Sequence, residues 1–391
     1  MAKLGDVCEV LNGFAFKSDQ YVESGIRIIR IANVQKGYIE DSSPTFYPMD
    51  SVEAKKYQLK ENDLLMSLTG NVGRVGLLTS NFLPAALNQR VACLRIKDRS
   101  ILEKVYLFHV LNSDFFEQKC IEFANGVAQK NMSTEWLKEY EIPVPSLDAQ
   151  RRIAAVLDKV SGLIAKRREQ LDKLDELVKA RFVEMFGIPG TDKFGWGLIA
   201  LGTVCCINPK KSEDKRLGIG VRLSFVPMPA VTETGEIDVS AIKTYEEVKT
   251  GFTYFAENDV LFAKITPCME NGKGAIAKGL YNGIGFGSTE FHVLRPVSGK
   301  TNPYWIYALT MFPQFRVDAE NSMTGSAGQR RVPASFLEDY RVAVPPINLQ
   351  EEFAAFVKET DKSKLTIQQS LDKLEVLKKA LMQGYFKQKG F

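Results

Sequence analysis

The chain repeats itself with a period of about half its length. The tetrapeptide Leu-Asp-Lys-Leu stands at 171–174 and again at 371–374, an offset of 200 residues. The same offset pairs Leu137 with Leu337, Tyr140 with Tyr340, Pro145 with Pro345, Gln150 with Gln350, and Phe186 with Phe386. A series of matches in the same order indicates a duplicated unit, and a period this long excludes the short repeats of solenoid proteins.

The beginnings of the two halves match as well, at an offset of 197 residues. The segment Leu4-Gly5-Asp6-Val7-Cys8 resembles Leu201-Gly202-Thr203-Val204-Cys205. Farther along, Asn62-Asp63-Leu64-Leu65 resembles Asn258-Asp259-Val260-Leu261. The fold therefore has to accommodate two copies of one unit, and we expect an internal pseudo-two-fold repeat.

The first part of each half is rich in short apolar runs that glycine and proline interrupt. Such runs are typical of β-strands. The predicted strands are 26–34, 63–68, 75–79 and 91–96 in the first half, and 260–265, 274–278 and 290–294 in the second. Helices are predicted at 102–112 and 304–311. Residues 1–148 and 196–348 are each predicted to form a compact α+β domain.

The second part of each half has the pattern of one long amphipathic helix. Its apolar residues recur mostly in steps of three and four. They are Ile153, Val156, Val160, Leu163, Ile164, Leu171, Leu174, Val178 and Phe182 in the first half, and Phe353, Phe356, Ile367, Leu371, Leu374, Leu377 and Leu381 in the second. We expect helices over 149–187 and 349–391, with Asp148 and Asn348 as their N-caps.

A helix of about 37 residues is about 55 Å long, which is too long for one small domain to bury its apolar face. Two such helices in one chain can cover each other's apolar faces as a coiled coil. Because the chain has to leave the first helix, form the second domain and return, an antiparallel pair is favoured. We therefore predict an α+β fold in which two long antiparallel helices join two globular domains and act as a ruler between them.

The composition allows nucleic-acid binding without requiring it. The chain has 51 basic and 47 acidic residues, a net charge of +4, which attracts a polyanion only where the basic residues cluster. No apolar run is long enough to span a membrane, and the first residues lack the apolar segment of a signal peptide, so we expect a cytoplasmic protein. Six scattered cysteines without a CxxC pair, and only two histidines, predict neither a disulfide framework nor a zinc site.

Two similar domains at a fixed spacing suggest two recognition heads on one linear ligand, and duplex DNA is the natural candidate. Each domain has a glycine-bearing loop between two predicted strands, at 67–76 and at 264–274. Two further polar segments recur at matching places, 88–90 with 288–290 and 126–133 with 325–331. Glycine lets a backbone approach a phosphate closely, and Thr, Asn, Gln and Arg side chains bond phosphates and base edges.

The candidate DNA-binding residues are the polar residues of these loops. In the first half they are Thr69, Asn71, Arg74, Asn88, Gln89, Arg90, Gln129, Lys130, Asn131 and Ser133. In the second half they are Lys264, Thr266, Asn271, Lys273, Ser288, Thr289, Glu290, Ser326, Gln329, Arg330 and Arg331. Because Arg330-Arg331 stands where the first half has Lys130-Asn131, the two heads are not expected to make identical contacts.

The order of these motifs resembles that of the specificity subunits of type I restriction–modification systems, over essentially the whole chain. The motifs are the Leu4-Gly5-Asp6-Val7 opening, Asn62-Asp63 followed by the glycine loop, and Gln129-Lys130-Asn131 leading into Ile142-Pro143-Val144-Pro145 with Gln150 downstream. The second half carries Ile265-Thr266-Pro267, Asn271-Gly272-Lys273-Gly274 and Ser288-Thr289-Glu290-Phe291-His292. Each motif is weak alone, but their order, twice in one chain, is specific.

The resemblance implies that each globular part is a target-recognition domain that reads one half of an asymmetric, split site in double-stranded DNA. It implies that the helices are the spacer and the docking surface for two methyltransferase (M) subunits, and that restriction (R) subunits join the complex. It implies no catalysis and no cofactor in this chain. Docking on the helices requires exposed anchors, and the candidates are Phe182, Phe186, Tyr385 and Phe386.

Other functions fit the sequence less well. A nuclease needs carboxylates around Mg²⁺, and the two ExK spacings, Glu53 with Lys55 and Glu247 with Lys249, are of a common kind. An amino-methyltransferase needs a proline-rich catalytic tetrapeptide, and 302–305 has only one proline. A coiled-coil scaffold with two heads for peptide or glycan explains the helices and the duplication, but not the basic, amide-bearing loops. Salt-dependent binding to duplex DNA separates the scaffold from a DNA reader.

Overall fold

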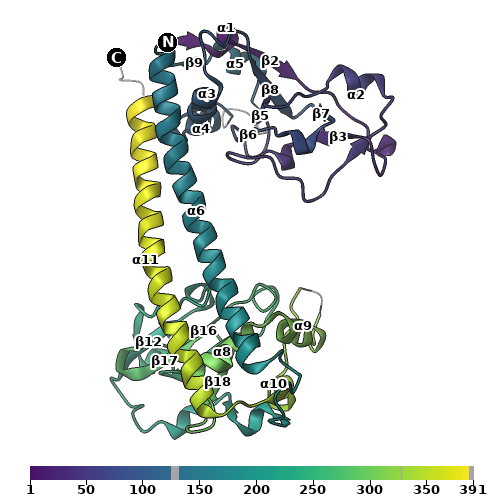
Figure 1. Ribbon diagram of the computed structural model, residues 1–391. Coiled ribbons are helices and arrows are strands. Elements are labelled where there is room, and N and C mark those ends of the chain that lie inside the picture. The colour runs from purple at the N-terminus through teal and green to yellow at the C-terminus, as the bar shows by residue number, and fades with distance from the viewer. Residues whose placement is uncertain (125–131, 327, 387–391) are drawn as a thin grey trace. The chain divides into compact units, whose positions relative to one another are not determined.

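The structure is a computed structural model that describes residues 1–124, 132–326 and 328–386 (Figure 1). It divides into two compact units. Met1–Arg168 and Gln368–Phe391 form the first, and Glu169–Ile367 forms the second. Each unit therefore contains one globular part, together with a segment from each of two long helices.

The first globular part contains nine strands and five short α-helices among the described residues. The strands are β1 (Ala2–Lys3), β2 (Cys8–Asn12), β3 (Ile26–Ile29), β4 (Phe46–Tyr47), β5 (Leu64–Ser67), β6 (Val75–Leu77), β7 (Ala85–Leu87), β8 (Val91–Ile96) and β9 (Glu141–Ile142). The helices are α1 (Leu4–Val7), α2 (Val52–Lys56), α3 (Lys104–Leu111), α4 (Asp114–Ala124) and α5 (Thr134–Glu139). The long helix α6 (Leu147–Phe186) follows.

The second globular part has the same order of main elements. Its strands are β10 (Leu198–Ala200), β11 (Cys205–Ile207), β12 (Arg222–Val226), β13 (Ile242–Thr244), β14 (Thr253–Ala256), β15 (Val260–Ala263), β16 (Gly274–Ile276), β17 (Ile284–Gly287), β18 (Phe291–Pro296) and β19 (Arg341–Ala343). Its helices are α7 (Tyr245–Val248), α8 (Pro303–Met311), α9 (Pro313–Asn321) and α10 (Ala334–Asp339). The second long helix is α11 (Ile347–Phe386).

The sheets repeat between the two parts. The strand order β2-β8-β5-β6 in the first part corresponds to β11-β18-β15-β16 in the second. The register corresponds too, since Leu64 pairs with Leu94 and Val260 pairs with Leu294. A second sheet in each part contains one parallel pair, β3 with β7 and β12 with β17. The predicted α+β class and the predicted duplication are therefore confirmed.

The central strands are apolar throughout because both faces of their sheet are buried. Successive side chains of a strand point to opposite faces. In β5, Leu64 and Met66 join a core that contains helices α3 and α4, whereas Leu65 joins a second core that contains β7. In β15, Phe262 and Leu261 divide between two cores in the same way.

The repeated Asn-Asp motif has a structural role. Asn62 and Asn258 adopt a left-handed backbone, with φ of 70° and 68°, a conformation that asparagine tolerates well. The next residue, Asp63, accepts two hydrogen bonds from the Arg95 guanidinium, at 2.8 and 2.7 Å. Asp259 and Arg295 form the same pair at the same two distances. The motif therefore fixes the turn into the central strand, and its carboxylate is held in an ion pair in both units.

Helices α6 and α11 are both 40 residues long and begin and end at equivalent positions. The prediction of Asp148 and Asn348 as N-caps is wrong by two residues, since both lie inside the first turn. The Gln150 N–H bonds to the Ser146 carbonyl and the Gln350 N–H to the Pro346 carbonyl, which makes Ser146 and Pro346 the cap residues. Asp148 still lies where a negative charge interacts favourably with the helix dipole.

Within each unit the two long helices run antiparallel, as predicted (Figure 1). In the first unit, Arg168 pairs with Glu375 at 2.7 Å. In the second, Asp175 pairs with Lys364, and Arg181 pairs with Glu352 at 2.8 Å. The α11 number falls as the α6 number rises, which is the sign of an antiparallel pair. These exposed pairs each contribute little stability, and apolar contact carries most of the association.

The apolar stripe of the helices is only partly buried. Val160, Ile164 and Phe182 are buried, as the periodicity predicts. However, Val156, Leu163 and Leu377, which share that periodicity, are 40, 39 and 46% exposed. The stripe is wider than the face that the neighbouring helix and domain cover. Among the described residues, no helix is both long enough and apolar enough to cross a membrane.

One buried glutamine ties the start of each long helix to its domain. The Gln150 amide donates to the carbonyls of Ile101 and Pro145 at 2.9 and 2.8 Å, and its oxygen accepts from the Glu103 N–H at 2.8 Å. Gln350 makes the equivalent three bonds, to Lys300, Pro345 and Asn302, at 2.8 to 2.9 Å. Both side chains are fully buried, which explains why this residue recurs in both halves.

The Gln350→Leu variant should lose about 2 to 4 kcal/mol of unfolding free energy, because it leaves one N–H and two carbonyls buried without partners. The measurement is urea unfolding of the full chain, followed by circular dichroism. Gln369→Leu is the matched control, since Gln369 lies exposed on the same helix, and its stability should change by less than about 0.5 kcal/mol. Equal losses in the two variants would contradict the anchoring role.

Candidate nucleic-acid interface

The glycine loop of the first part connects β5 to β6 and is held by its own polar groups. The Ser67 hydroxyl bonds to the Asn71 carbonyl and accepts from the Arg74 N–H at 3.1 Å. The Arg74 guanidinium donates to the Gln35 side-chain oxygen at 2.6 Å and lies 3.3 Å from the side-chain amide of Asn71. The loop is therefore held by its own polar groups together with Gln35, and it leaves Asn71 exposed and Thr69 half-buried.

Two glycines set the course of this loop. Gly70 and Gly73 have φ of 67° and 82°, a region that side-chain-bearing residues rarely adopt. At Gly73, a Cβ atom would also lie 2.8 Å from the Cys120 Cβ of α4. Glycine is therefore required at 73 on two grounds, backbone conformation and close packing against the helix.

Three of the predicted segments meet at the end of β5. The Leu68 N–H bonds to the Arg90 carbonyl at 3.0 Å, and the Met132 N–H bonds to the Leu68 carbonyl at 2.8 Å. Gln89 and Arg90 are exposed beside this junction, and Asn88 is half-buried. The predicted residues Gln129, Lys130 and Asn131 lie outside the described residues.

Ser133, which the sequence predicts to bind DNA, has a local structural role. Its hydroxyl accepts from the Trp136 N–H at 3.1 Å and caps helix α5. Serine is a favoured N-cap because its oxygen pairs one of the free N–H groups of the first turn. Its presence in a polar loop therefore has a structural explanation that the sequence pattern did not distinguish from binding.

The same junction forms in the second part, at the end of β15. The Lys264 N–H bonds to the Glu290 carbonyl, and the Val332 N–H bonds to the Lys264 carbonyl, both at 2.9 Å. The Thr266 N–H bonds to the Arg330 carbonyl at 3.1 Å. The three segments that the sequence matched across the repeat thus converge in each unit by equivalent backbone bonds.

The predicted residues of this second junction differ in how much they are engaged. Thr289, Asn271, Ser326 and Gln329 are exposed, and Ser288, Lys273 and Arg330 are half-buried. The Thr266 hydroxyl donates to Glu270 at 2.9 Å. Lys264 is half-buried, and this burial lowers the pKa of its amine. Arg330 forms loose ion pairs, with Glu320 at 3.4 Å and with Glu270 at 3.7 Å.

The strongest charge contact of the junction joins two predicted residues, Glu290 and Arg331. The Arg331 Nη2 and Nε atoms lie 2.7 and 2.9 Å from the two carboxylate oxygens of Glu290. The hydrogen bond from Arg331 holds the pKa of Glu290 below its usual range. The pair stays ionised at neutral pH and remains partly open to solvent, with the two side chains 42 and 25% exposed.

His292 is a packed residue beside this pair. It is 5% exposed, one ring nitrogen lies 2.8 Å from the Val332 carbonyl, and the other lies 3.0 Å from the Asn208 amide. Burial lowers the pKa of the imidazole. A histidine with both nitrogens engaged in this way positions the segment that carries Arg331 and is not poised for proton transfer.

The sequence did not indicate a role for Arg316, whose side chain holds the backbone of the second glycine loop. Its guanidinium donates to the Met269 carbonyl at 2.9 Å and lies 4.6 Å from the centre of the Phe262 ring. Burial lowers its pKa to about 10. Nothing in the pattern marks this residue, because a single arginine in an amphipathic helix is ordinarily exposed.

The predicted partner-contact aromatics are mostly interior. Phe182 and Phe186 are 2 and 4% exposed in the core of the second unit, and Phe386 is 3% exposed in the core of the first. The prediction that these three are exposed anchors is wrong, because the ends of the long helices complete the domain cores. Only Tyr385, at 36%, is exposed as expected.

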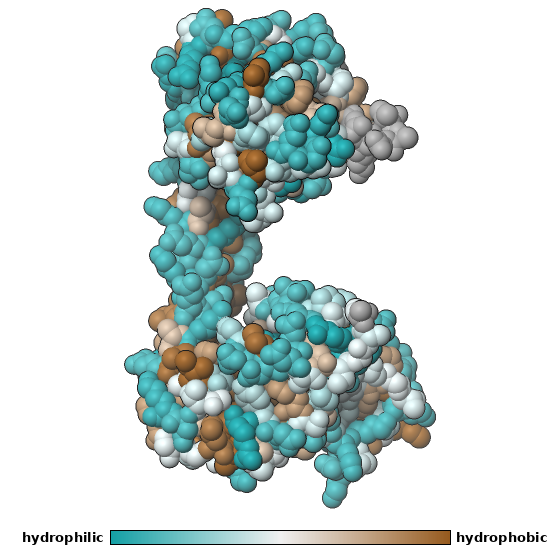
Figure 2. Space-filling view, turned by 90° about the vertical axis from the view of Figure 1, so that its right-hand side faces the viewer, coloured by the Kyte–Doolittle hydropathy of each residue, from teal (hydrophilic) through white to brown (hydrophobic). Residues whose placement is uncertain are grey.

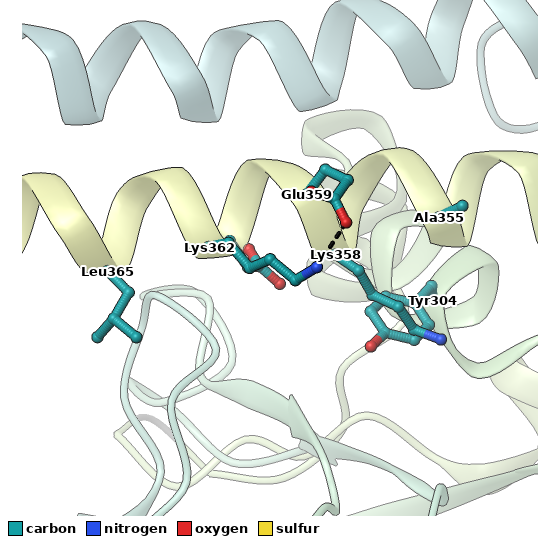
Figure 3. A pocket seen from close by; sticks show the side chains of 7 residues that line it. Tyr304, Ala355, Lys358, Glu359, Lys362 and Leu365 are labelled. Atoms are coloured by element: carbon teal, nitrogen blue, oxygen red, sulfur yellow. Dashed lines mark hydrogen bonds and ion pairs between the residues drawn. The ribbon is translucent and has the colours of Figure 1, made fainter.

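A shallow depression on α11 in the second unit does not have the chemistry of a small-molecule site (Figure 3). It is lined by Tyr304, Ala355, Lys358, Glu359, Asp361, Lys362 and Leu365. Lys278 donates to the Tyr304 hydroxyl at 2.7 Å, and Lys362 pairs with Glu359 at 2.6 Å. Such local pairing is typical of a solvated helix face. The described residues contain no group of three or more potential metal ligands.

The Gly73→Ala variant should destabilise the first unit by at least about 1 to 2 kcal/mol, because alanine resists a positive φ and its Cβ collides with Cys120. Gly162→Ala is the opposite control. Gly162 lies within α6 with open space around it, so alanine should stabilise by about 0.5 to 1 kcal/mol. Thermal unfolding midpoints that do not move in opposite directions would refute the argument.

Known proteins match the chain in both halves. The model of the type I restriction modification DNA specificity domain matches residues 1–175 and again 196–378. The specificity subunit of the Escherichia coli type I restriction enzyme EcoEI is 44% identical over 39% of this chain and 25% of its own length. That of EcoAI, also from E. coli, is 39% identical over 53% of this chain and 33% of its own length. These matches cover less than half of either relative.

A solved structure shares the fold. The S subunit of a type I restriction–modification system from M. genitalium aligns with a TM-score of 0.54 at 16% identity, over 99% of this chain and 96% of that one. Its likeness supports the architecture, and the family match to both halves covers most of the sequence. This chain therefore belongs to the family of type I restriction modification DNA specificity domains and carries one copy of that domain in each half.

Proposed function

We propose that this chain is the specificity subunit of a type I restriction–modification complex, and that each globular part reads one half of a split site in duplex DNA. The observation that carries the proposal is the junction that recurs in both units. In each, three segments converge through equivalent backbone bonds. They are the loop after β5 or β15, the segment before β8 or β18, and the segment before α5 or α10. The same backbone arrangement occurs in both units with different polar side chains, which is suited to the recognition of two different half-sites.

The chemistry of the junction residues fits this role. Exposed amide and basic side chains, such as Asn71, Gln89 and Arg90, can bond phosphates and base edges. Loops held from within lose little freedom on binding, which favours affinity. The polar loop residues that the sequence predicts to bind DNA are therefore proposed to contact it, and Ser133 also acts as a helix cap.

The proposed division of labour follows the repeat. Residues 1–148 and 196–348 are the two target-recognition domains, and residues 149–187 and 349–391 are the spacer helices. The helices set the distance between half-sites in the same way as a dimer interface sets half-site spacing in other DNA readers. The chain itself carries out no catalysis, and we propose a cytoplasmic location, where host DNA is accessible.

The partners of this proposal are two M subunits docked on the helices, with R subunits joining the complex. Two half-exposed leucines at repeat-equivalent positions, Leu177 and Leu377, are the proposed anchors. They are 48 and 46% exposed, although leucine at a helix position is usually covered. Figure 2 shows that hydrophilic residues predominate on one face of the molecule and that apolar residues there form small patches. Equivalent anchors on the two helices suit two copies of one partner.

A methylation map tests the function. The chain, co-expressed with its cognate methyltransferase subunit, should direct adenine methylation of host DNA at one split motif, which disappears when the chain is omitted. Exchanging residues 1–148 for those of another family member should change one half of the motif and leave the other. Binding of the complex to the mapped duplex should weaken steeply with added salt. A soluble complex that methylates no motif would contradict the proposal.

The docking proposal predicts a stoichiometry. Leu177→Asp and Leu377→Asp should each remove one methyltransferase subunit from the complex, and the double variant should remove both, because a charge at a buried contact loses its hydration. Native mass spectrometry counts the subunits. Lys179→Asp and Lys379→Asp, exposed on nearly the opposite side of each helix, are the controls. Two retained subunits in the leucine variants would refute the anchors.

A further inference from the structure

Glu290 and Arg331 are held rigidly where the second junction faces solvent. The Arg331 backbone exchanges two hydrogen bonds with Thr324, at 2.8 and 3.0 Å, and also bridges to Ile265. Glu290 immediately precedes β18, and its carbonyl accepts from the Lys264 N–H. Both residues are thus fixed by backbone bonds before their side chains meet.

The Arg331 guanidinium has donors left over. It carries five N–H groups. Glu290 occupies the Nε–H and one Nη2–H, at 2.9 and 2.7 Å, and the Gln329 carbonyl occupies one Nη1–H at 3.2 Å. One N–H on each terminal nitrogen therefore has no partner among the described residues, and the side chain is 42% exposed.

These two remaining donors match one feature of duplex DNA. In the major groove, guanine presents two acceptors side by side, O6 and N7, and arginine contacts this pair more often than it contacts any other base edge. An arginine whose other edge is bonded to a carboxylate cannot rotate freely, so its donors are oriented in advance. The cost of ordering a long side chain on binding is correspondingly reduced.

We propose that Arg331 reads a guanine in the half-site recognised by the second unit, and that Glu290 is the positioning residue that orients it. The inference rests on the proposed function and assigns one base within it. Among the described residues, Arg330, the adjacent residue, forms only loose ion pairs, at 3.4 and 3.7 Å. A side chain with that freedom suits a phosphate contact, which positions the protein without reading sequence.

The first unit does not repeat this device. Arg90 stands at the position of Glu290, so the acceptor that orients Arg331 is replaced by another donor. No described residue forms an ion pair with Arg90. An arginine oriented by a carboxylate in this way is therefore proposed for the second half-site.

The experiment uses the complex of the full chain with its methyltransferase subunit. The probes are a duplex that carries the motif mapped for the wild-type complex and duplexes in which each guanine of the second half-site is replaced in turn. The wild-type complex should bind the replaced duplex about 5- to 150-fold more weakly at each specific position. In Arg331→Gln, the ratio of the affinity for the original duplex to that for the replaced duplex should fall toward one at a single guanine. At that position the variant should favour adenine, the base that glutamine prefers.

Two further variants separate reading from folding. Arg330→Gln carries the same chemical change one residue away and should weaken all duplexes together. Glu290→Gln preserves the size of the side chain and should reduce discrimination at the same guanine as Arg331→Gln, with an unchanged thermal unfolding midpoint. If Arg331→Gln fails to fold, the change in guanine discrimination in Glu290→Gln tests the proposal by itself.

The outcomes are distinct. If the wild-type complex recognises a split motif but neither Arg331→Gln nor Glu290→Gln alters selectivity at any guanine, the guanine contact is overturned and the proposed function stands. If both residues affect all duplexes equally, they contact the backbone and the assignment is likewise overturned. If the wild-type complex recognises no split motif, the proposed function fails, and the assignment fails with it.

Discussion

The burial of the helix ends is the constraint on which the two units depend. In the second unit, Phe182 and Phe186 of α6 pack edge to face against Phe353 of α11, with ring centres 5.3 to 5.7 Å apart. In the first unit, Phe386 of α11 packs against Tyr106 at 5.7 Å. Burying a phenylalanine contributes roughly 1.5 to 3 kcal/mol. Each core is thus closed by the terminal aromatic residues of the helix that belongs to the other half of the repeat.

This reciprocal closure explains why the repeat is so even. The two helices have the same length and end at equivalent phenylalanines. A residue inserted in one helix would rotate its terminal aromatic by about 100° and remove it from the core it completes. Helix length, helix register and domain stability are therefore coupled, and the matching glutamines Gln150 and Gln350 fix the starts of the same helices. The loops that differ between the halves lie outside this set of contacts.

Much of the fold could be predicted from the sequence, and the candidate site only in outline. Buried strands and long helices have strong periodic signals, and the duplication doubled each one. The sequence showed that the three loop segments recur in the same order in both halves, but only the structure shows that they meet, at Leu68 and Lys264. The role of each side chain could not be predicted, because it depends on neighbours distant in sequence. Arg316 and the Glu290–Arg331 pair are examples.

The errors have physical causes as well. Aromatic residues at a helix end give the same pattern whether a partner or the chain's own domain covers them, and Phe182, Phe186 and Phe386 proved interior. The apolar stripe predicts a face but not its width, so Val156 and Leu163 remained partly exposed. The cap of α11 lies two residues earlier than predicted because this helix begins directly after Pro346. Proline is well tolerated at the start of a helix.

The position of Phe386 has a consequence for how the protein is made. The core of the first unit contains Leu4 and is closed by Phe386, which follows the whole second globular part in the sequence. That domain therefore cannot reach its final packing until the second globular part and α11 have also been synthesised. During that interval the apolar surface of the incomplete core is exposed, and the nascent chain is prone to aggregation until the core is closed.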